Sequence, residues 1–344
     1  MHRILIAVAS GVLVVLVSTA CHAQGVPTKQ EAADLNRRVG ESMRLQTPGT
    51  MPFHLTAVFH IEIAGESFDG TYEILWLNPE QHREEFRMGR VGETDLVLGD
   101  KRYILRTTPT LTLQLWDVRS LLAEPFPLIK DYDPKIERVH AEQDSKQFYV
   151  DAYQGAPEAA WKMKFWYDIS TRKIVSIHGE QSQPRFGSIP PPDFSLELSD
   201  FVSLGTRRIP QRWHRNVFGQ SVDVHIEKLE EVSTFASSVF MAPPHATVYD
   251  TCRADNAKWS GPWPHFPSVL LTHPKAIPAY YLLLGQDGRV KKSDALIASG
   301  GTVDRDMEKW FHDTPLPTML CDGKPVEYET IVIPQAAVSF GMAH

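Results

Sequence analysis

The residues of this sequence that could do chemistry are mainly histidines and carboxylates, which can bind metal ions or act as acids and bases. There are 14 His and 42 Asp and Glu residues. His54 and His60 lie in one strand-like run, and Asp223 shares a face with His225 in another. Zinc sites usually take ligands from closely spaced motifs such as His-Glu-x-x-His or Cys-x-x-Cys, and neither motif occurs. The spacing therefore predicts surface histidines and no metal site.

The motifs of nucleophilic and phosphate chemistry are also missing from the sequence. Gly40-Glu41-Ser42 and Gly65-Glu66-Ser67 lack the second glycine of the Gly-x-Ser-x-Gly elbow found in hydrolases. No glycine-rich phosphate loop occurs. A formal net charge of −7 and a pI near 6.1 argue against a nucleic-acid-binding protein, which normally has a basic surface. We expect a protein that is not an enzyme and that has no cofactor and no nucleic-acid partner.

The first 23 residues have the layout of a secretory signal peptide. A weakly basic start at residues 1–3 precedes an apolar run of 17 residues, 4–20, and Cys21-His22-Ala23 forms a small-x-Ala cleavage site. We predict cleavage after Ala23 and export. Two alternatives remain open. The run is just long enough to stay as an inner-membrane anchor, or Cys21 is lipidated, although the Leu usual three positions before such a cysteine is missing.

Two cysteines, Cys252 and Cys321, remain after removal of this leader. An even pair of cysteines in an exported chain is a disulfide candidate, because export leads into an oxidising compartment. In a chain-entropy estimate, closing a loop of this length stabilises the fold by roughly 4 kcal/mol. The alternative is two separate buried thiols, since small hydrophobic cysteines are often buried.

The region from 24 to 242 combines one helix with many half-buried strands. Thr28-x-x-Glu31 is a capping box that predicts a helix start. Beyond Gly49 the apolar residues recur with period two, the pattern of strands with one buried face. The clearest runs are 53–63, 72–76, 161–169, 194–198 and 222–226. We predict a large curved antiparallel sheet behind one N-terminal helix, in a protein of the α+β class.

This order of elements resembles the LolA-like family of periplasmic lipoprotein carriers. The local phrases that carry the resemblance are Gly70-Thr71-Tyr72-Glu73, Trp76-Leu77-Asn78-Pro79, Arg83-Glu84-Glu85 and Phe240-Met241-Ala242-Pro243-Pro244. The resemblance implies an incomplete barrel, or half-barrel, whose concave face is covered by helices and can hold acyl chains. Our candidates for lining residues are Phe59, Ile61, Tyr72, Ile74, Trp76, Phe165 and Tyr167. The alternative is a filled sheet core with no cavity, since aromatic side chains serve both purposes.

The C-terminal region, 268–344, predicts a small domain with the order ββαββ. Asp287-Gly288 and Asp322-Gly323 are hairpin signals, because glycine enters positive φ without Cβ strain. Between them Val303, Met307, Trp310 and Phe311 recur at helical spacing, with Thr302 as N-cap. We expect Trp310 and Phe311 to be core residues and residues 243–267 to be a linker.

This C-terminal pattern resembles the C-terminal domain of TonB-like energy transducers. The resemblance rests on DGRV, a helix ending in Trp-Phe, CDGKPV and a final amphipathic strand. The family's Pro-Tyr-Pro-type lead-in is missing, with Ala276-Ile277-Pro278-Ala279-Tyr280 in its place, which puts partner binding in doubt. The resemblance implies an interaction module that adds a strand to a partner at a sheet edge.

Two functions follow from these patterns. The first is a non-enzymatic periplasmic binding or adaptor protein, whose partner is a lipid or a lipoprotein acyl chain. The second is a TonB-like transducer or scaffold with an uncleaved anchor, whose partner is an outer-membrane or other envelope protein. Cleavage after Ala23 separates the two, because force transmission needs an inner-membrane anchor.

Overall fold

The computed structural model describes most of the chain beyond the predicted leader. The described residues are 26–63, 65–122, 135–141, 146–154, 161–181, 193–217, 220–252, 257–261, 263–264, Phe266, 278–298 and 302–332. The predicted signal peptide, 1–23, lies outside them, as does Cys21. Within the described residues, no helix is long and apolar enough to span a membrane.

The first element is the helix α1 (Lys29–Met43). The predicted capping box is present, because the Thr28 hydroxyl accepts from the backbone N–H of Glu31 and the Glu31 carboxylate accepts from that of Thr28. The buried side of α1 consists mostly of small or slender residues, namely Ala32, Leu35, Asn36, Gly40 and Met43.

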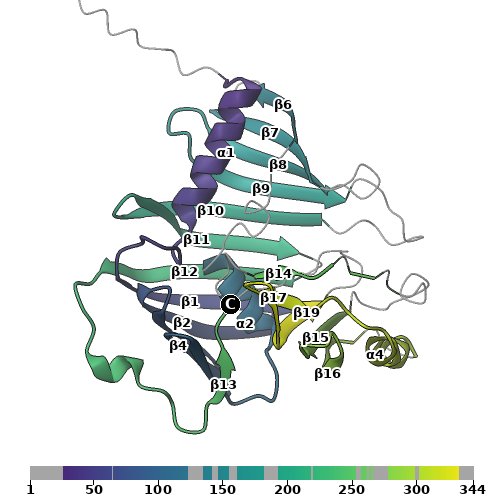
Figure 1. Ribbon diagram of the computed structural model, residues 1–344. Helices are drawn as coiled ribbons and strands as arrows, with labels where there is room; N and C mark the ends of the chain where they lie inside the picture. Colours follow the sequence, from purple (N-terminus) through teal and green to yellow (C-terminus); the bar gives the residue numbers. More distant parts are fainter. Residues whose placement is uncertain are drawn as a thin grey trace, which may run out of the picture.

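A large open antiparallel sheet follows α1 in the chain (Figure 1). Its strands are β1 (Phe53–Ile63), β2 (Glu66–Asn78), β3 (Gln81–Met88), β4 (Val91–Leu98), β5 (Lys101–Arg106), β6 (Lys135–Ala141), β7 (Gln147–Gln154), β8 (Trp161–Asp168), β9 (Ile174–Gln181), β10 (Asp193–Leu204), β11 (Arg207–Val217), β12 (Gln220–Glu231) and β13 (Thr247–Asp250). Among the described residues their order is β13-β5-β4-β3-β2-β1-β12-β11-β10-β9-β8-β7-β6. Sequence neighbours pair throughout except at the β1–β12 and β13–β5 junctions, which join distant parts of the chain. The predicted class, mostly antiparallel sheet with few helices, is confirmed.

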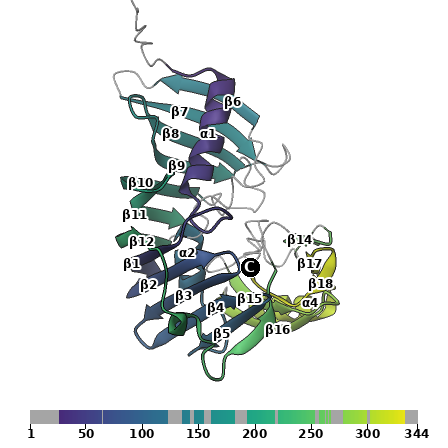
Figure 2. The ribbon, with the colours of Figure 1, turned by 60° about the vertical axis from the view of Figure 1, so that its left-hand side comes forward.

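One face of the large sheet is apolar and covered, and it is called the inner face below. On β1 the residues at odd positions from Phe53 to Ile61 are buried, which confirms the predicted alternation. Figures 1 and 2 show α1, the helix α2 (Leu113–Leu122) and the C-terminal elements on the same side of the sheet. Contacts place α1 against β6 and β11, and α2 against β12. The hydrophobic core therefore forms a layer between the sheet and these three covers.

The C-terminal elements form two small sheets and one helix. They are β14 (Ala257–Trp259), β15 (Ala279–Leu284), β16 (Val290–Ile297), α4 (Val303–Asp313), β17 (Met319–Cys321), β18 (Lys324–Val326) and β19 (Tyr328–Val332). One sheet has the order β14-β17-β18 and the other β16-β15-β19. Residues 278–298 and 302–332 are called the C-terminal subdomain below. Its resemblance to a transducer module stays a prediction.

Three details of the predicted C-terminal pattern differ in the structure. The strand expected after Gly323 is broken at Glu327, so β18 pairs with β17 whereas β19 pairs with β15, and all five residues of β19 are buried. Thr302 is the N-cap residue of α4 but its side chain makes no capping bond. Phe311 is buried as expected, but Trp310 is only half-buried and packs on Phe266.

The segment expected as a linker, 243–267, contributes strands to both parts of the molecule. β13 extends the edge of the large sheet beside β5, and β14 pairs with β17. Trp259 packs edge-on against Trp263 and Tyr328, at ring-centroid distances of 5.2 and 5.4 Å. In the structure Cys252 and Cys321 form a disulfide, with their Cα atoms 5.5 Å apart. The domain boundaries 24–242, 243–267 and 268–344 remain predictions.

Candidate ligand-binding face

The seven predicted lining residues all lie on the inner face, but in two separate groups. Phe59, Ile61, Tyr72, Ile74 and Trp76 lie on the adjacent strands β1 and β2, whereas Phe165 and Tyr167 lie on β8. β12, β11, β10 and β9 run between the two groups. Neighbouring strands are about 4.8 Å apart, so the groups are separated by about 24 Å. All seven side chains are buried in one continuous apolar cluster.

The β1–β2 group is ordered by aromatic packing. Phe59 stacks on Phe86 of β3 with ring centroids 5.1 Å apart, and Trp76 stacks on Phe53 at 6.1 Å. Burial raises the pKa of the Tyr72 hydroxyl far above its ordinary value, so Tyr72 stays neutral and donates a hydrogen bond to Glu84. This group is therefore apolar at its centre and ends on a buried acid.

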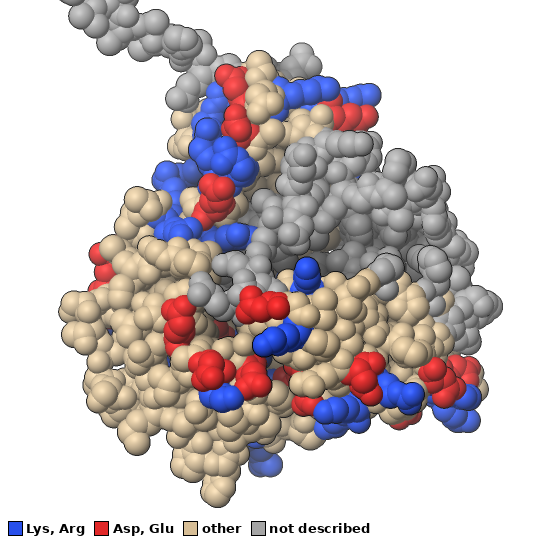
Figure 3. Space-filling model, in the orientation of Figure 1, with Lys and Arg blue, Asp and Glu red and all other residues tan. Residues whose placement is uncertain are grey.

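The β8 group lies beneath α1. Tyr167 stacks on Phe148 of β7 at 5.2 Å, and its hydroxyl donates to the side-chain oxygen of Asn36 on α1. Burial raises the pKa of Tyr167 as well, so this hydroxyl also remains a donor. The solvent side of α1 carries interspersed basic and acidic side chains, such as the Arg37–Asp34 and Arg37–Glu41 pairs (Figure 3). α1 is thus an amphipathic cover held by a narrow strip of side chains.

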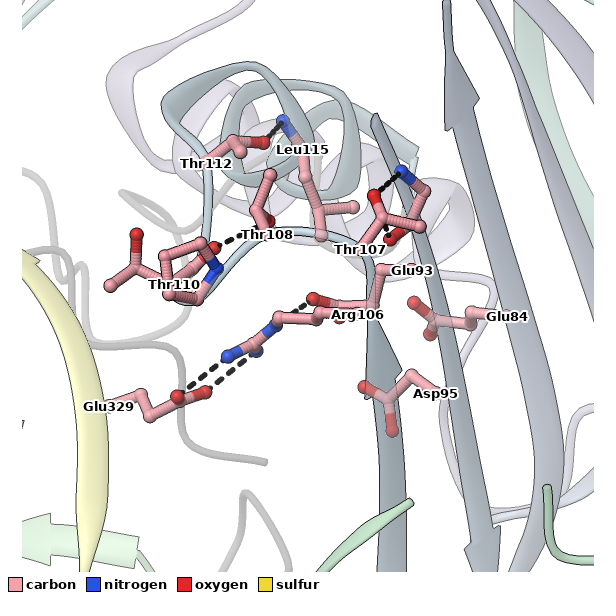
Figure 4. Close-up of polar contacts among 12 residues, drawn as sticks. Glu84, Glu93, Asp95, Arg106, Thr107, Thr108, Thr110, Thr112, Leu115 and Glu329 are labelled. Carbon is pink, nitrogen blue, oxygen red and sulfur yellow. Dashed lines mark hydrogen bonds and ion pairs between the residues drawn. The ribbon is translucent and has the colours of Figure 1, made fainter. Parts of the chain in front are cut away.

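A buried cluster of charged side chains interrupts the apolar face at β3, β4 and β5, and is called the charge cluster below. Its carboxylates are Glu84, Glu93, Asp95 and Glu329, and its guanidinium groups belong to Arg102, Arg106 and Arg119. Each of these side chains is at most 10% exposed. Figure 4 shows Arg106 between Glu93 and Glu329, with Glu84 and Asp95 on the neighbouring strands.

Arg119 connects α2 to this cluster. Its guanidinium donates to Glu84 at 2.8 Å and to Glu93 at 3.0 Å. Burial alone would lower the pKa of Arg119, but the surrounding acidic groups outweigh burial and raise it. Burial raises the pKa of Glu84, but Arg119, His82 and the hydrogen bond from Gln46 together outweigh burial and lower it. Both groups therefore remain charged in the interior.

A second buried ion pair holds the helix α2 to the strand β11 on the same face of the sheet. Asp117 of α2 accepts from Arg215 of β11 and from the side-chain amide of Gln220 on β12. Burial raises the pKa of Asp117, and these two donors only partly offset that effect. Asp117 and Arg119 thus tie α2 to β11–β12 and to β3–β4, so α2 crosses the strands β2 and β1 that lie between them.

Sequence reasoning missed this charge cluster because charged residues were assigned to the solvent. A signal was present in β3, since Glu84 lies two positions before the buried Phe86 and four before Met88. Period-two alternation puts Glu84 on the same face as these two side chains. The opposite charges come from α2 and β5, and the other carboxylates come from β4 and β19. No local pattern identifies such distant partners.

The prediction that the chain has no metal site and no catalytic site can be compared with the described residues only. In that part of the chain, no three His, Cys, Asp or Glu side chains are placed so as to hold a metal ion. His60 and His214 lie on the outer face of the sheet and pair with Asp69 and Asp223 at 2.8 and 2.7 Å. These are cross-strand pairs, as surface sheets often contain. The absence of catalytic activity stays a prediction.

Comparison with known proteins gives distant structural likenesses. No family model matches the sequence, and neither does any curated protein. A LolA superfamily protein from Nitrosomonas europaea is similar with a TM-score of 0.40 and 11% identity, over 61% of this chain and 97% of that one. A DUF1329 family protein from Desulfovibrio piger has a TM-score of 0.39 and 8% identity, over 62% and 96%.

The Pseudomonas aeruginosa MucA/MucB complex is also similar, with a TM-score of 0.28 and 14% identity over 75% of this chain and 81% of that one. At these TM-scores and identities, the likenesses assign no family, substrate or partner to this chain.

Proposed function

We propose that the chain is an exported, non-enzymatic binding protein of the periplasm that holds an acyl chain or another apolar ligand on the inner face of the large sheet. The observation that carries this proposal is the cover above Phe165 and Tyr167. α1 crosses an apolar part of the sheet through a narrow strip that includes Ala32, Asn36 and Gly40. An apolar chain that displaces α1 would have to replace mainly the packing of Leu35 and Met43, since the other buried positions of the strip are small or polar.

The polar groups of the interior support a passive role. Each carboxylate and each guanidinium group of the charge cluster is paired with another charged side chain of the protein. Such groups position α2 and the C-terminal subdomain. Under α1 the described aromatic contacts include one with a cation, since the guanidinium of Arg172 lies 5.1 Å from the Phe148 ring centroid. A ligand bound there would be held by apolar burial.

The direct experiment is a search for bound lipid. The mature chain would be purified without detergent and extracted with organic solvent, and the extract examined by lipid mass spectrometry. Titration with a fluorescent fatty acid would follow. We expect saturable binding that Phe165→Ala weakens by about 10- to 150-fold, because one fully buried aromatic contributes about 1.5–3 kcal/mol.

The matched control is Trp166→Ala. Trp166 neighbours Phe165 on β8 but lies half-buried on the outer face, where it contacts Tyr149. Circular dichroism melting would show that both variants are folded. Binding that is absent, or weakened equally by both substitutions, would contradict a ligand site beneath α1. Trp76→Ala tests in the same way whether the β1–β2 group takes part.

The alternative function, a TonB-like transducer or scaffold, depends on a free sheet edge and on an N-terminal anchor. The strand β16 is an edge strand of its three-stranded sheet, so it offers an edge for strand addition. The anchor falls outside the described residues. The mass of the mature N-terminal peptide distinguishes the two functions. A chain that begins at Gln24 fits a carrier, and a chain that keeps its apolar leader fits a transducer.

A further inference from the structure

The C-terminal subdomain has a hydrophobic core of its own. On β15, Tyr280, Leu282 and Leu284 face α4 and pack in a cluster with Met307 and Phe311. The opposite side of the same small sheet packs on the main core through the buried Ala279, Tyr281 and Ile331 and through the partly buried Leu283, Leu296 and Ile297. A unit with its own core can keep its structure when its contact with a neighbour is broken.

A buried polar contact fastens this subdomain to the large sheet, and is called the latch below. At the surface, Lys292 of β16 also donates to the carbonyl oxygen of Pro109 at 3.1 Å. Both guanidinium Nη atoms of Arg106 donate to the carboxylate of Glu329, each at 2.7 Å, in a bidentate pair (Figure 4). The hydroxyl of Tyr281 donates to the same carboxylate at 2.7 Å. Glu329 and Tyr281 belong to the subdomain, whereas Arg106 ends β5 of the large sheet.

The charge cluster is balanced without Glu329. On the side of the large sheet and α2, the described residues of the cluster are three carboxylates, Glu84, Glu93 and Asp95, and three guanidinium groups. Breaking a buried pair is costly when it leaves a buried charge without a partner. Arg106 keeps its contact with Glu93 if Glu329 leaves, and Glu329 then enters water. Among the ion pairs of the charge cluster, the Arg106–Glu329 pair is therefore the one whose breaking costs the least free energy.

A covalent link holds the subdomain at another point. Cys252 lies two residues beyond the end of β13 on the large sheet, and its disulfide partner Cys321 ends β17. The strand β14 pairs with β17 beside this link. An opened subdomain would therefore remain attached, and a short tether keeps its effective concentration near its docking surface high.

We propose that the C-terminal subdomain is a tethered cover that detaches reversibly from the inner face, with the Arg106–Glu329 pair as its latch and the Cys252–Cys321 disulfide as its tether. Detachment uncovers the inner face beside β5 while the small core around Met307 and Phe311 stays intact. The cover serves any ligand or partner that reaches this part of the sheet, so the opening does not depend on the identity of what binds.

Hydroxyl-radical footprinting of the oxidised mature chain, read residue by residue by mass spectrometry, tests this opening. Tyr281 is 1% exposed and reports detachment, and Met307 is fully buried and reports the subdomain's own core. The variant Glu329→Gln keeps the shape of the latch and removes its charge. The matched control Glu327→Gln removes the exposed ion pair with Lys291 in the same subdomain.

We expect labelling of Tyr281 to rise by about 10- to 150-fold in Glu329→Gln, because a hydrogen bond to a charged group contributes about 1.5–3 kcal/mol. Labelling of Met307 should stay at the level of the unmodified protein, and Glu327→Gln should change neither residue. Adding Cys252→Ser and Cys321→Ser to Glu329→Gln should raise the labelling of Tyr281 further.

Two results would overturn the proposal. Tyr281 labelling that is the same in Glu329→Gln and Glu327→Gln would show that the ion pair is not a latch. A parallel rise of Tyr281 and Met307 would show that the subdomain unfolds when its contact is lost, and so is not a cover that detaches as a unit.

Discussion

The ring of Phe59 lies directly over Gly70, its cross-strand partner on β2. A Cβ atom at position 70 would lie 2.1 Å from Cζ of Phe59 and 2.4 Å from the carbonyl oxygen of Arg87. The missing side chain lets the Phe59 ring reach across β2 and stack on Phe86. Gly70 therefore positions one of the predicted lining residues.

Gly70→Ala should lower the free energy of unfolding by about 1–3 kcal/mol, the usual cost of overpacking a core. Urea titration of the mature chain measures it. Gly92→Ala is the control, because the nearest atom to a Cβ there is 3.6 Å away and that position should be neutral or slightly stabilised. Equal stability of the two variants would mean that Phe59 does not occupy the space above Gly70.

The substitution Arg119→Met tests the charge cluster. It leaves Glu84, Glu93 and Asp95 with fewer positive partners in the interior, which should cost about 3–5 kcal/mol of stability. Arg37→Met removes exposed pairs on α1 and should cost less than about 1 kcal/mol. Chemical denaturation measures the free energy of unfolding of both variants. A decrease below about 1 kcal/mol in Arg119→Met would contradict a buried network of ion pairs.

Removing a single oxygen atom, the Tyr167 hydroxyl, should weaken the contact between α1 and the large sheet. Tyr167→Phe removes the hydroxyl that donates to Asn36 and keeps the aromatic ring in place. We expect a loss of about 1–3 kcal/mol, because a buried amide oxygen is left without its donor, together with faster proteolytic cleavage within α1. Tyr149→Phe, on the outer face of β7, is the control. Unchanged proteolysis in Tyr167→Phe would show that α1 is held by apolar contacts alone.

The turn between β8 and β9 predicts a pH effect. Asp168 accepts hydrogen bonds from Ser170 and Thr171, which lower its pKa to about 2. Because the folded-state pKa lies below the ordinary value of about 3.9, the stabilisation is present above that value and is lost as the pH falls towards about 2. Carboxyl NMR titration should return an Asp168 pKa near 2 and a higher value in Thr171→Ala. Identical values in the two proteins would exclude hydrogen bonding from Thr171 as the cause.

Thiol chemistry checks the link between Cys252 and Cys321. Labelling under non-reducing conditions should find no free thiol in the mature chain, since the two sulfurs are bonded. Reduction should lower the free energy of unfolding by up to about 4 kcal/mol, because it restores the entropy of a long loop in the unfolded chain. The double variant Cys252→Ser and Cys321→Ser should match the reduced protein. Two titratable thiols in freshly exported protein would rule the bond out.

Local patterns in the sequence were sufficient for several elements of this fold. The capping box at Thr28 predicted the start of α1, and the alternation from Phe53 to Ile61 predicted the buried face of β1. Asp322 and Gly323 both have positive φ, 51° and 78°, as a two-residue hairpin turn requires. Such features depend on neighbouring residues only, so a short stretch of sequence is enough to predict them.

Tertiary structure decided the features that depend on distant residues. Arg106 and Glu329 are 223 positions apart, and their pairing makes a buried contact of two residues that each look like surface charges. The break at Glu327 is of the same kind, since β19 leaves its hairpin to pair with β15 across the subdomain. A strand's alternation sets which residues share a face, but the long-range register decides what covers that face and which charges meet there.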